Sequence, residues 1–155
     1  MDFQTWLEVQ NLHLRYAQIV DSDDFSAWPD LFTPDGIYAI QSRENHEAKL
    51  PLCILRFESQ AMLRDRVYGV MNTIYHAAYY QRHIVSQPTI TVTDAAIEAE
   101  TAYLVHRTHR DQLPEILSTG RYLDRMVVTP QGLRFSQRLC IFDNDLIANS
   151  LIKPI

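Results

Sequence analysis

The spacing of the apolar residues changes near residue 82, from a helical period to an extended one. Two segments before that point, 3–20 and 58–74, carry apolar residues at three- and four-residue steps, which indicates amphipathic helices. Helices first and an antiparallel meander later predict an α+β domain, in which a curved sheet encloses an apolar cone and leaves its other face free for a second subunit. We expect the strands near residues 82–93, 97–110, 115–128 and 133–143.

Glycine, proline and apolar pairs add detail to the strand region. Thr129-Pro130-Gln131-Gly132 has Pro and Gly placed for a type I turn, so the last two strands should form a hairpin. Strand 97–110 has apolar groups on both faces, which predicts that both faces are covered. Gly120 lies in mid-strand, where a bulge or bend is common. Gly69, inside the helix over 58–74, suggests close packing there.

The first half of the chain contains further predicted elements. The first helix begins either at a capping box formed by Thr5 and Glu8 or at Asp2, a rival cap. In the helix over 58–74, the residues expected to point inward are Met62, Val67, Val70, Met71 and Ile74. Between the two helices we expect a short second helix over 23–32, a turn at 34–36, a short strand over 37–40, a polar loop over 42–49, and a strand or helix lead-in over 51–57.

Length and composition indicate one ordinary globular domain over residues 1–155. The hydrophobic share is 46%, the charged share is 21%, and no apolar run approaches the ~20 residues that span a bilayer. The first ten residues lack a basic region and an apolar core, so we expect a cytoplasmic protein with two free thiols, Cys53 and Cys140. A net charge of −5 argues against nucleic acid as a partner.

Aromatic, Arg and His side chains are concentrated in residues 75–83. Such side chains are enriched at protein interfaces and in ligand pockets, since rigid rings and the guanidinium fork bind with little loss of entropy. The alternative is core filling where a helix gives way to a strand, because Tyr is often half-buried with a wet hydroxyl. The predicted interface residues are Tyr75, His76, Tyr79, Tyr80, Arg82 and His83.

Two other features predict contacts. Arg64 and Arg66 are either part of a solvated helix face or part of the same interface. The last residues, SLIKPI, are apolar at Leu151, Ile152 and Ile155, so they should dock on this chain's own sheet or on a neighbouring subunit.

Three blocks of the sequence carry a family resemblance. They are ESQAMLRDRVYGV with YHAAYYQRHIV, LHLRYAQIVDSDDFSAWPDLFTPDGIY, and GLRFSQRLCIFDNDLIANSLIKPI. In this order they resemble the small (β) subunit of aromatic-ring-hydroxylating (Rieske non-haem iron) oxygenases, in the salicylate 5-hydroxylase, anthranilate and terephthalate oxygenase branch. The resemblance covers nearly the whole chain and implies the nuclear-transport-factor-2-like (SnoaL-like) cone fold.

The resemblance also implies a function. Three copies of the chain would form a trimer under three large α subunits, in an α3β3 hexamer that takes part in aromatic carboxylate catabolism. The α subunit would hold the Rieske [2Fe-2S] cluster and the mononuclear Fe(II), and a separate reductase would supply electrons from NAD(P)H. This chain would be a non-catalytic scaffold without cofactor.

The residues themselves are compatible with that division of labour. A Rieske cluster needs two Cys and two His, whereas Cys53 and Cys140 lie far apart and neither begins a Cys-x-His pair. His106 and His109 fall on a predicted strand, where positions i and i+3 point to opposite faces. We therefore expect no metal site on this chain.

Two other functions are open. In a stand-alone dehydratase or isomerase, Asp23 (or Asp21) and His83 would meet in the cone and shuttle protons, as in the cone-fold enzymes that this layout resembles. The residue-level alternative is that the Asp is a helix cap and His83 a buried hydrogen-bonding residue. A plain ligand-binding cone would bind a small aromatic molecule without turnover.

Overall fold

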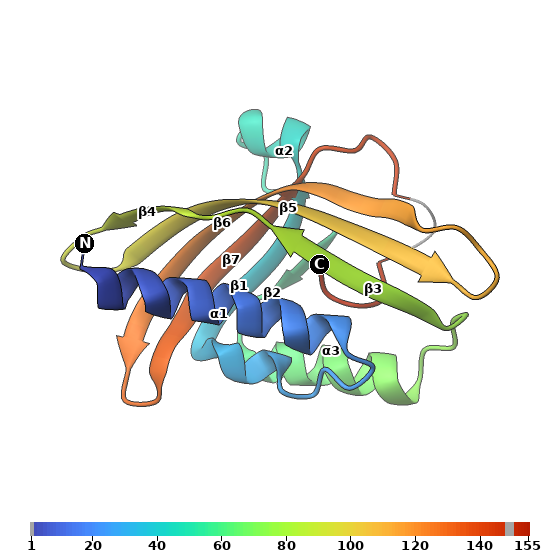
Figure 1. The fold of residues 1–155 in the computed structure, drawn as a ribbon, viewed down its shortest axis with the longest axis horizontal. Helices are drawn as coiled ribbons and strands as arrows, with labels where there is room; N and C mark the ends of the chain where they lie inside the picture. Colours follow the sequence, from blue (N-terminus) through green and yellow to red (C-terminus); the bar gives the residue numbers. More distant parts are fainter. Residues whose placement is uncertain (1, 148–150) are drawn as a thin grey trace.

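The computed structural model describes residues 2–147 and 151–155. The strands form one seven-stranded sheet in the order β2-β1-β7-β6-β5-β3, with β4 also paired to β5. Every pairing is antiparallel except the parallel pairing of β1 with β7. Figure 1 shows α1 running across one face of the curved sheet, with α3 below α1 in this view. The strands are β1 (Phe32–Ser42), β2 (Leu55–Phe57), β3 (Tyr79–Val85), β4 (Thr89–Val92), β5 (Ile97–His109), β6 (Glu115–Thr129) and β7 (Gly132–Phe142).

The first helix, α1 (Phe3–Asp21), confirms the prediction for residues 3–20. Its buried face consists of residues at three- and four-residue steps, as an amphipathic helix requires. The cap is Asp2, whose carboxylate accepts a hydrogen bond from the Thr5 N–H at 2.7 Å. Of the two alternatives, the cap at Asp2 is therefore confirmed, and the capping box of Thr5 and Glu8 is not. The buried residues of α1 are Val9, Leu12, His13, Tyr16 and Val20.

The strands after residue 96 lie where the sequence placed them. β5, β6 and β7 pair in order, and β6 turns into β7 between Thr129 and Gly132, which confirms the hairpin. Gly132 has φ +99°, a conformation that favours glycine. The predicted strand over 82–93 is two strands, β3 and β4, both paired to β5.

The region of residues 23–57 differs from its prediction. Instead of a helix over 23–32, only one 3-10 turn forms, η1 (Trp28–Leu31). Pro34-Asp35-Gly36 does not form a turn that precedes a separate strand, because β1 runs through these three residues. The three residues do disrupt the ladder, since the register to β7 shifts between Phe32 and Ile37. The polar segment over 42–49 contains a helix, α2 (Arg43–Glu47), whose cap is the Ser42 hydroxyl.

The helix predicted over 58–74 is α3 (Gln60–Asn72), capped by the Ser59 hydroxyl. Its inward residues are Leu63, Val67 and Val70. Met62 and Met71, which we expected inside, are 41% and 47% exposed, because α3 presents only a narrow stripe to the sheet. Close packing at Gly69 was also wrong, since a Cβ there would meet nothing nearer than the Thr73 Oγ1 at 3.8 Å.

The outer face of β5 is not covered in the single chain, contrary to expectation. Tyr103 and Val105 point into the core, but Ala102 is exposed and Leu104 is only half-buried. The neighbouring outward residue Ile84, which pairs with Leu104 across β3 and β5, is 57% exposed. Ile84, Ala102 and Leu104 therefore form a small apolar area on the outer face of the sheet.

Side chains from α1, α3 and the concave face of the sheet fill the cone. The largest fully buried side chains include Trp28, Tyr16, Tyr38 and Tyr122, together with one charged residue, Arg138. No helix within residues 2–147 and 151–155 is long and apolar enough to cross a membrane.

Candidate functional site

An ion pair lies in the centre of the cone, where cone-shaped enzymes would need an open cavity. Asp124 of β6 and Arg138 of β7 are cross-strand partners whose side chains both point inward. The Arg138 Nε donates to Asp124 Oδ1 at 2.8 Å, and Nη2 donates to Oδ2 at 2.7 Å. Both side chains are 0% exposed. This bidentate geometry satisfies the carboxylate fully at both oxygens.

Aromatic rings surround the guanidinium of Arg138. Its central carbon lies 4.0 Å from the Tyr16 ring centroid, 4.2 Å from that of Tyr122 and 4.1 Å from that of Phe135. These contacts are cation–π interactions in a desolvated site. Burial opposes ionisation of Asp124, but the adjacent Arg138 outweighs it and holds the pKa of Asp124 below its usual value. The pair is therefore ionised, and it fills the cone as a structural element.

His13 of α1 completes this cluster. Its Nε2 lies 3.2 Å from Asp124 Oδ2, and its Nδ1 lies 3.4 Å from Arg138 Nη2. Burial lowers the pKa of His13 against the opposing effect of Asp124, and the nearby Arg138 charge acts in the same direction as burial. His13 is thus a neutral side chain that links α1 to the ion pair between β6 and β7.

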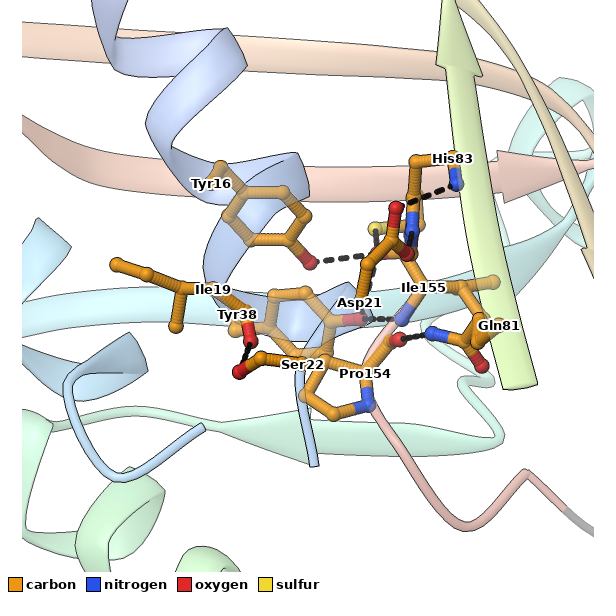
Figure 2. Close-up of polar contacts among 10 residues, drawn as sticks. Tyr16, Ile19, Asp21, Ser22, Tyr38, Gln81, His83, Pro154 and Ile155 are labelled. Carbon is orange, nitrogen blue, oxygen red and sulfur yellow. Dashed lines mark hydrogen bonds and ion pairs between the residues drawn. The ribbon is translucent and has the colours of Figure 1, made fainter. Parts of the chain in front are cut away.

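A second polar pair joins the end of α1 to β3. Asp21 Oδ1 lies 2.6 Å from His83 Nδ1, and Asp21 Oδ2 accepts the His83 backbone N–H at 2.9 Å (Figure 2). Of the two acids considered for the alternative enzymatic function, Asp21 contacts His83 and Asp23 does not. The chain leaves α1 at Ser22, so the Asp23 side chain is 91% exposed and lies 3.4 Å from Lys153 Nζ. The carboxylate that contacts His83 is therefore that of Asp21.

The C-terminal tail closes the space beside this pair. The Tyr16 hydroxyl donates to the backbone oxygen of Ile155 at 2.6 Å, and the Tyr38 hydroxyl contacts the nitrogen and oxygen of Ile155 at 3.0 Å each (Figure 2). The Gln81 side chain donates to the Pro154 oxygen at 2.7 Å. The predicted docking is confirmed for Leu151 and Ile155, which are buried in this chain's own cone, and Ile152 is half-buried. Ser150, the first residue of the quoted SLIKPI segment, lies outside the described residues.

The Asp21–His83 pair consequently has no access to a substrate. The His83 side chain is 0% exposed, and its buried Nε2 has no hydrogen-bond partner in the described part of the chain. The Tyr16 ring packs edge-on against the His83 ring, with 6.1 Å between the centroids, and the Tyr16 hydroxyl donates to Ile155. The same tyrosine therefore contacts both the tail and the Asp21–His83 pair. A general base must come within hydrogen-bond reach of the proton it abstracts, and this arrangement prevents that.

The burial of His83 makes stability depend on pH. Burial lowers the pKa of His83 below its ordinary value near 6.5, against the opposing effect of Asp21. Below about pH 6.5 the unfolded chain then binds more protons than the folded chain. The free energy of unfolding should therefore decrease as the pH is lowered from 7 to 5.

Urea titrations at several pH values check this slope. The variant His83→Gln should show a shallower fall, with the remainder due to His13. His76→Gln, an exchange at an exposed imidazole, is the control. Equal slopes for His83→Gln and the unmodified chain would contradict the assignment.

The structure divides the predicted interface residues into two groups. Along β3 the side chains alternate, so Tyr79 and His83 point inward, whereas Tyr80 and Arg82 point outward. Tyr75 is 98% exposed and Tyr80 is 75% exposed. His76 is exposed as well. The outward group, Tyr75, His76, Tyr80 and Arg82, is available to a partner, and its role stays a prediction.

The two helix arginines have partners within the chain. Arg64 Nη2 pairs with Asp30 at 2.7 Å. Arg66 Nη2 donates to the backbone oxygens of Leu151 at 2.8 Å and Ile152 at 3.0 Å, so it holds the tail. Sequence reasoning did not identify the Asp124–Arg138 pair at all. The available signal was a charged residue at an inward position on each strand of the predicted hairpin.

Residues 2–147 and 151–155 do not form a candidate metal site. These residues contain no group of three His, Cys, Asp or Glu side chains placed to hold a metal ion. Cys53 and Cys140 are free thiols, and burial raises the pKa of Cys140 to about 12. A thiol that is buried and protonated does not have the properties of a metal ligand.

Comparison with known proteins identifies a family and several relatives that this chain resembles. The model of the SnoaL-like domain family matches residues 3–139. The small subunit of anthranilate 1,2-dioxygenase from Burkholderia cepacia is 34% identical over 155 residues, which cover 99% of this chain and 96% of the relative. The terephthalate 1,2-dioxygenase terminal oxygenase component subunit beta 2 from Comamonas sp is 28% identical over 150 residues, with coverage of 96% and 97%.

A solved structure agrees with these relatives. It is a β subunit assigned to an aromatic-ring-hydroxylating dioxygenase of Novosphingobium aromaticivorans, with a TM-score of 0.88, 30% identity and 97% coverage of both chains. The benzoate 1,2-dioxygenase β subunit from Burkholderia mallei has a TM-score of 0.75 at 12% identity, which supports the fold. The predicted α+β cone is confirmed.

Proposed function

The chain belongs to the SnoaL-like family and, within it, to the small (β) subunits of aromatic-ring-hydroxylating dioxygenases, and from this premise we propose how it works in its enzyme. It is a structural, non-catalytic subunit, and its partner is a large oxygenase subunit. We propose that three copies form a ring under three α subunits, in an α3β3 hexamer located in the cytoplasm. The substrate would be an aromatic carboxylate such as salicylate, anthranilate or terephthalate.

The observation that carries a scaffolding role is the filled cone. The ion pair of Asp124 and Arg138 occupies its centre, and Ile155 occupies the space beside the Asp21–His83 pair. Both features fill space inside the cone, and the His83 side chain beside them is 0% exposed. The stand-alone dehydratase or isomerase is therefore not favoured, and neither is a ligand-binding cone that uses its interior.

The cofactors belong to the partner in this proposal. The free thiols Cys53 and Cys140 do not fit a Rieske cluster, which takes two Cys and two His. The Rieske [2Fe-2S] cluster and the mononuclear Fe(II) would lie on the α subunit, which carries out the oxygen chemistry. Electrons would reach it from NAD(P)H through a separate reductase.

The outer sheet face supports a subunit contact. Ile84 and Leu104 form an apolar centre, and outward-pointing Tyr80 and Arg82 lie on the same face of β3. Tyr and Arg, together with Trp, are enriched at interface hot spots. We propose that this face, defined by Tyr80, Arg82, Ile84, Ala102 and Leu104 and called the outer β3–β5 face, packs against another subunit of the hexamer.

A charge placed on the outer β3–β5 face should weaken assembly. In Ile84→Asp, the carboxylate would be desolvated in the interface, so the amount of large subunit recovered with the tagged chain should fall at least tenfold, which corresponds to about 1.4 kcal/mol. Because Ile84 is 57% exposed in the single chain, its fold should persist. Val128→Asp, at a residue 74% exposed near the β6–β7 turn, is the matched control. Full recovery with both Ile84→Asp and Tyr80→Ala would show that this face is not an interface.

A further inference from the structure

A pocket lies between the end of α3, the start of β3 and the tail. Its volume is about 350 Å³, within the range of small-molecule sites. Its walls combine apolar and aromatic side chains with three polar ones, the buried Lys153, the exposed Asp23 and the exposed His76. The apolar and aromatic wall residues include Val70, Met71, Tyr75 and Tyr79.

The Lys153 ammonium has an incomplete environment. Lys153 is 6% exposed, and among the described residues its Nζ contacts one carboxylate, Asp23 Oδ1, at 3.4 Å. Charge-assisted N–H to carboxylate hydrogen bonds are usually about 2.7–2.9 Å long, so this contact is a weak one. The Asp23 side chain is 91% exposed and free to turn towards solvent. A desolvated ammonium with three donors therefore lacks a strong anionic partner.

The ring of Tyr79 lies beside this cation. The Lys153 Nζ is 5.4 Å from the ring centroid, and the guanidinium carbon of Arg107 is 5.6 Å from it. Arg107 is neutralised by Glu115, with N–O distances of 2.9 and 2.6 Å, whereas Lys153 is not neutralised comparably. An adjoining hollow shares Asp23 and Tyr79 and adds a further cation, Arg110. In the pocket itself the charges of Lys153 and Asp23 balance, so an anion gains the full charge of Lys153 only when the exposed Asp23 side chain turns away to solvent.

We propose that this pocket binds a small aromatic carboxylate. The carboxylate pairs with Lys153 Nζ in place of Asp23, and the ring packs against Tyr79, Val70 and Met71, with Tyr75 at the rim. One charged group at the base of an apolar, aromatic pocket is the usual composition of such a site. The site is distinct from the Asp21–His83 pair, and the proposal does not depend on the hexamer.

Calorimetric titration of the full chain with benzoate tests this site, with benzamide as the neutral isostere. Benzoate should bind at least tenfold more tightly than benzamide. Lys153→Met should weaken benzoate binding at least tenfold, whereas Lys49→Met, which removes the same charge from an exposed position, should leave it unchanged. Asp23→Asn should tighten benzoate binding several-fold, because it removes the competing carboxylate.

The Asp23→Asn result keeps the test informative if Lys153→Met folds poorly, since the two substitutions must act in opposite directions. Equal affinity for benzoate and benzamide, or unchanged binding in Lys153→Met, would overturn the proposal. Failure of benzoate to bind would overturn it as well. A distinct outcome is that benzoate fails to bind while Lys153→Met releases the large subunit. In that case the pocket receives an acidic segment of a partner chain.

Discussion

The variant Asp124→Asn should lose about 3–5 kcal/mol of the free energy of unfolding. It removes the negative charge from the centre of the cone and leaves the Arg138 guanidinium, 0% exposed, without a counter-ion. Arg cannot escape this penalty by deprotonation. Asp124 also raises the pKa of Arg138, against the effect of burial, so the charge persists in the folded chain. Urea denaturation followed by circular dichroism measures the loss.

Two further variants separate the loss of charge pairing from the loss of any polar contact. Arg121→Gln breaks an exposed pair, since Arg121 Nη1 lies 3.3 Å from Glu100 and the side chains are 32% and 53% exposed. Its cost should be at most about 1 kcal/mol. The double variant Asp124→Leu/Arg138→Met, which leaves no buried charge, should recover most of the stability. An Asp124→Asn protein within 1 kcal/mol of the unmodified chain would contradict the central ion pair.

The same substitution at two glycines should have opposite effects. At Gly120, a Cβ would collide with the backbone oxygen of Ile141 and lie 2.9 Å from its carbonyl carbon. Because the obstacle is the backbone of β7, β6 and β7 must separate, and Gly120→Ala should cost more than about 3 kcal/mol. At Gly69, within a helix, a Cβ would make only an ordinary contact with the Thr73 Oγ1 at 3.8 Å, so Gly69→Ala should gain up to about 1 kcal/mol. Thermal or urea unfolding of both variants measures the difference.

The contrast between the glycines also tests the strand packing. A destabilised Gly69→Ala would mean that another chain packs closely on that face of α3. A Gly120→Ala protein as stable as the unmodified chain would mean that β6 and β7 are not as close as the structure has them.

Regular elements could be predicted because their causes are local. The apolar steps of α1, the extended segments after residue 82 and the Pro-Gly turn before β7 all act over a few residues. The errors arose where a distant contact decided the outcome. Pro34-Asp35-Gly36 reads as a chain reversal, yet parallel pairing with β7 carries β1 through it with a shift in register. The absence of a close neighbour beside Gly69 in the described part of the chain is likewise a tertiary property that the helix pattern does not contain.

The candidate site was only partly predictable for the same reason. His83 could be selected, but the choice between Asp21 and Asp23 depends on where α1 ends, and that is a matter of one or two residues. Asp124 and Arg138 looked like ordinary charged residues, because only their facing positions in β6 and β7 place them in the core. The tail could be expected to dock, since Leu151 and Ile155 are apolar, but its position beside Tyr16 and Tyr38 could not be read from the sequence.

The most direct test of the subunit assignment is to purify the tagged chain from its native cells, grown on an aromatic carboxylate. The mass, iron content and visible spectrum of the recovered complex are then measured together. The account predicts a larger partner in equal number, iron bound to that partner, and the absorption of a Rieske cluster. A chain recovered alone and free of iron would contradict it.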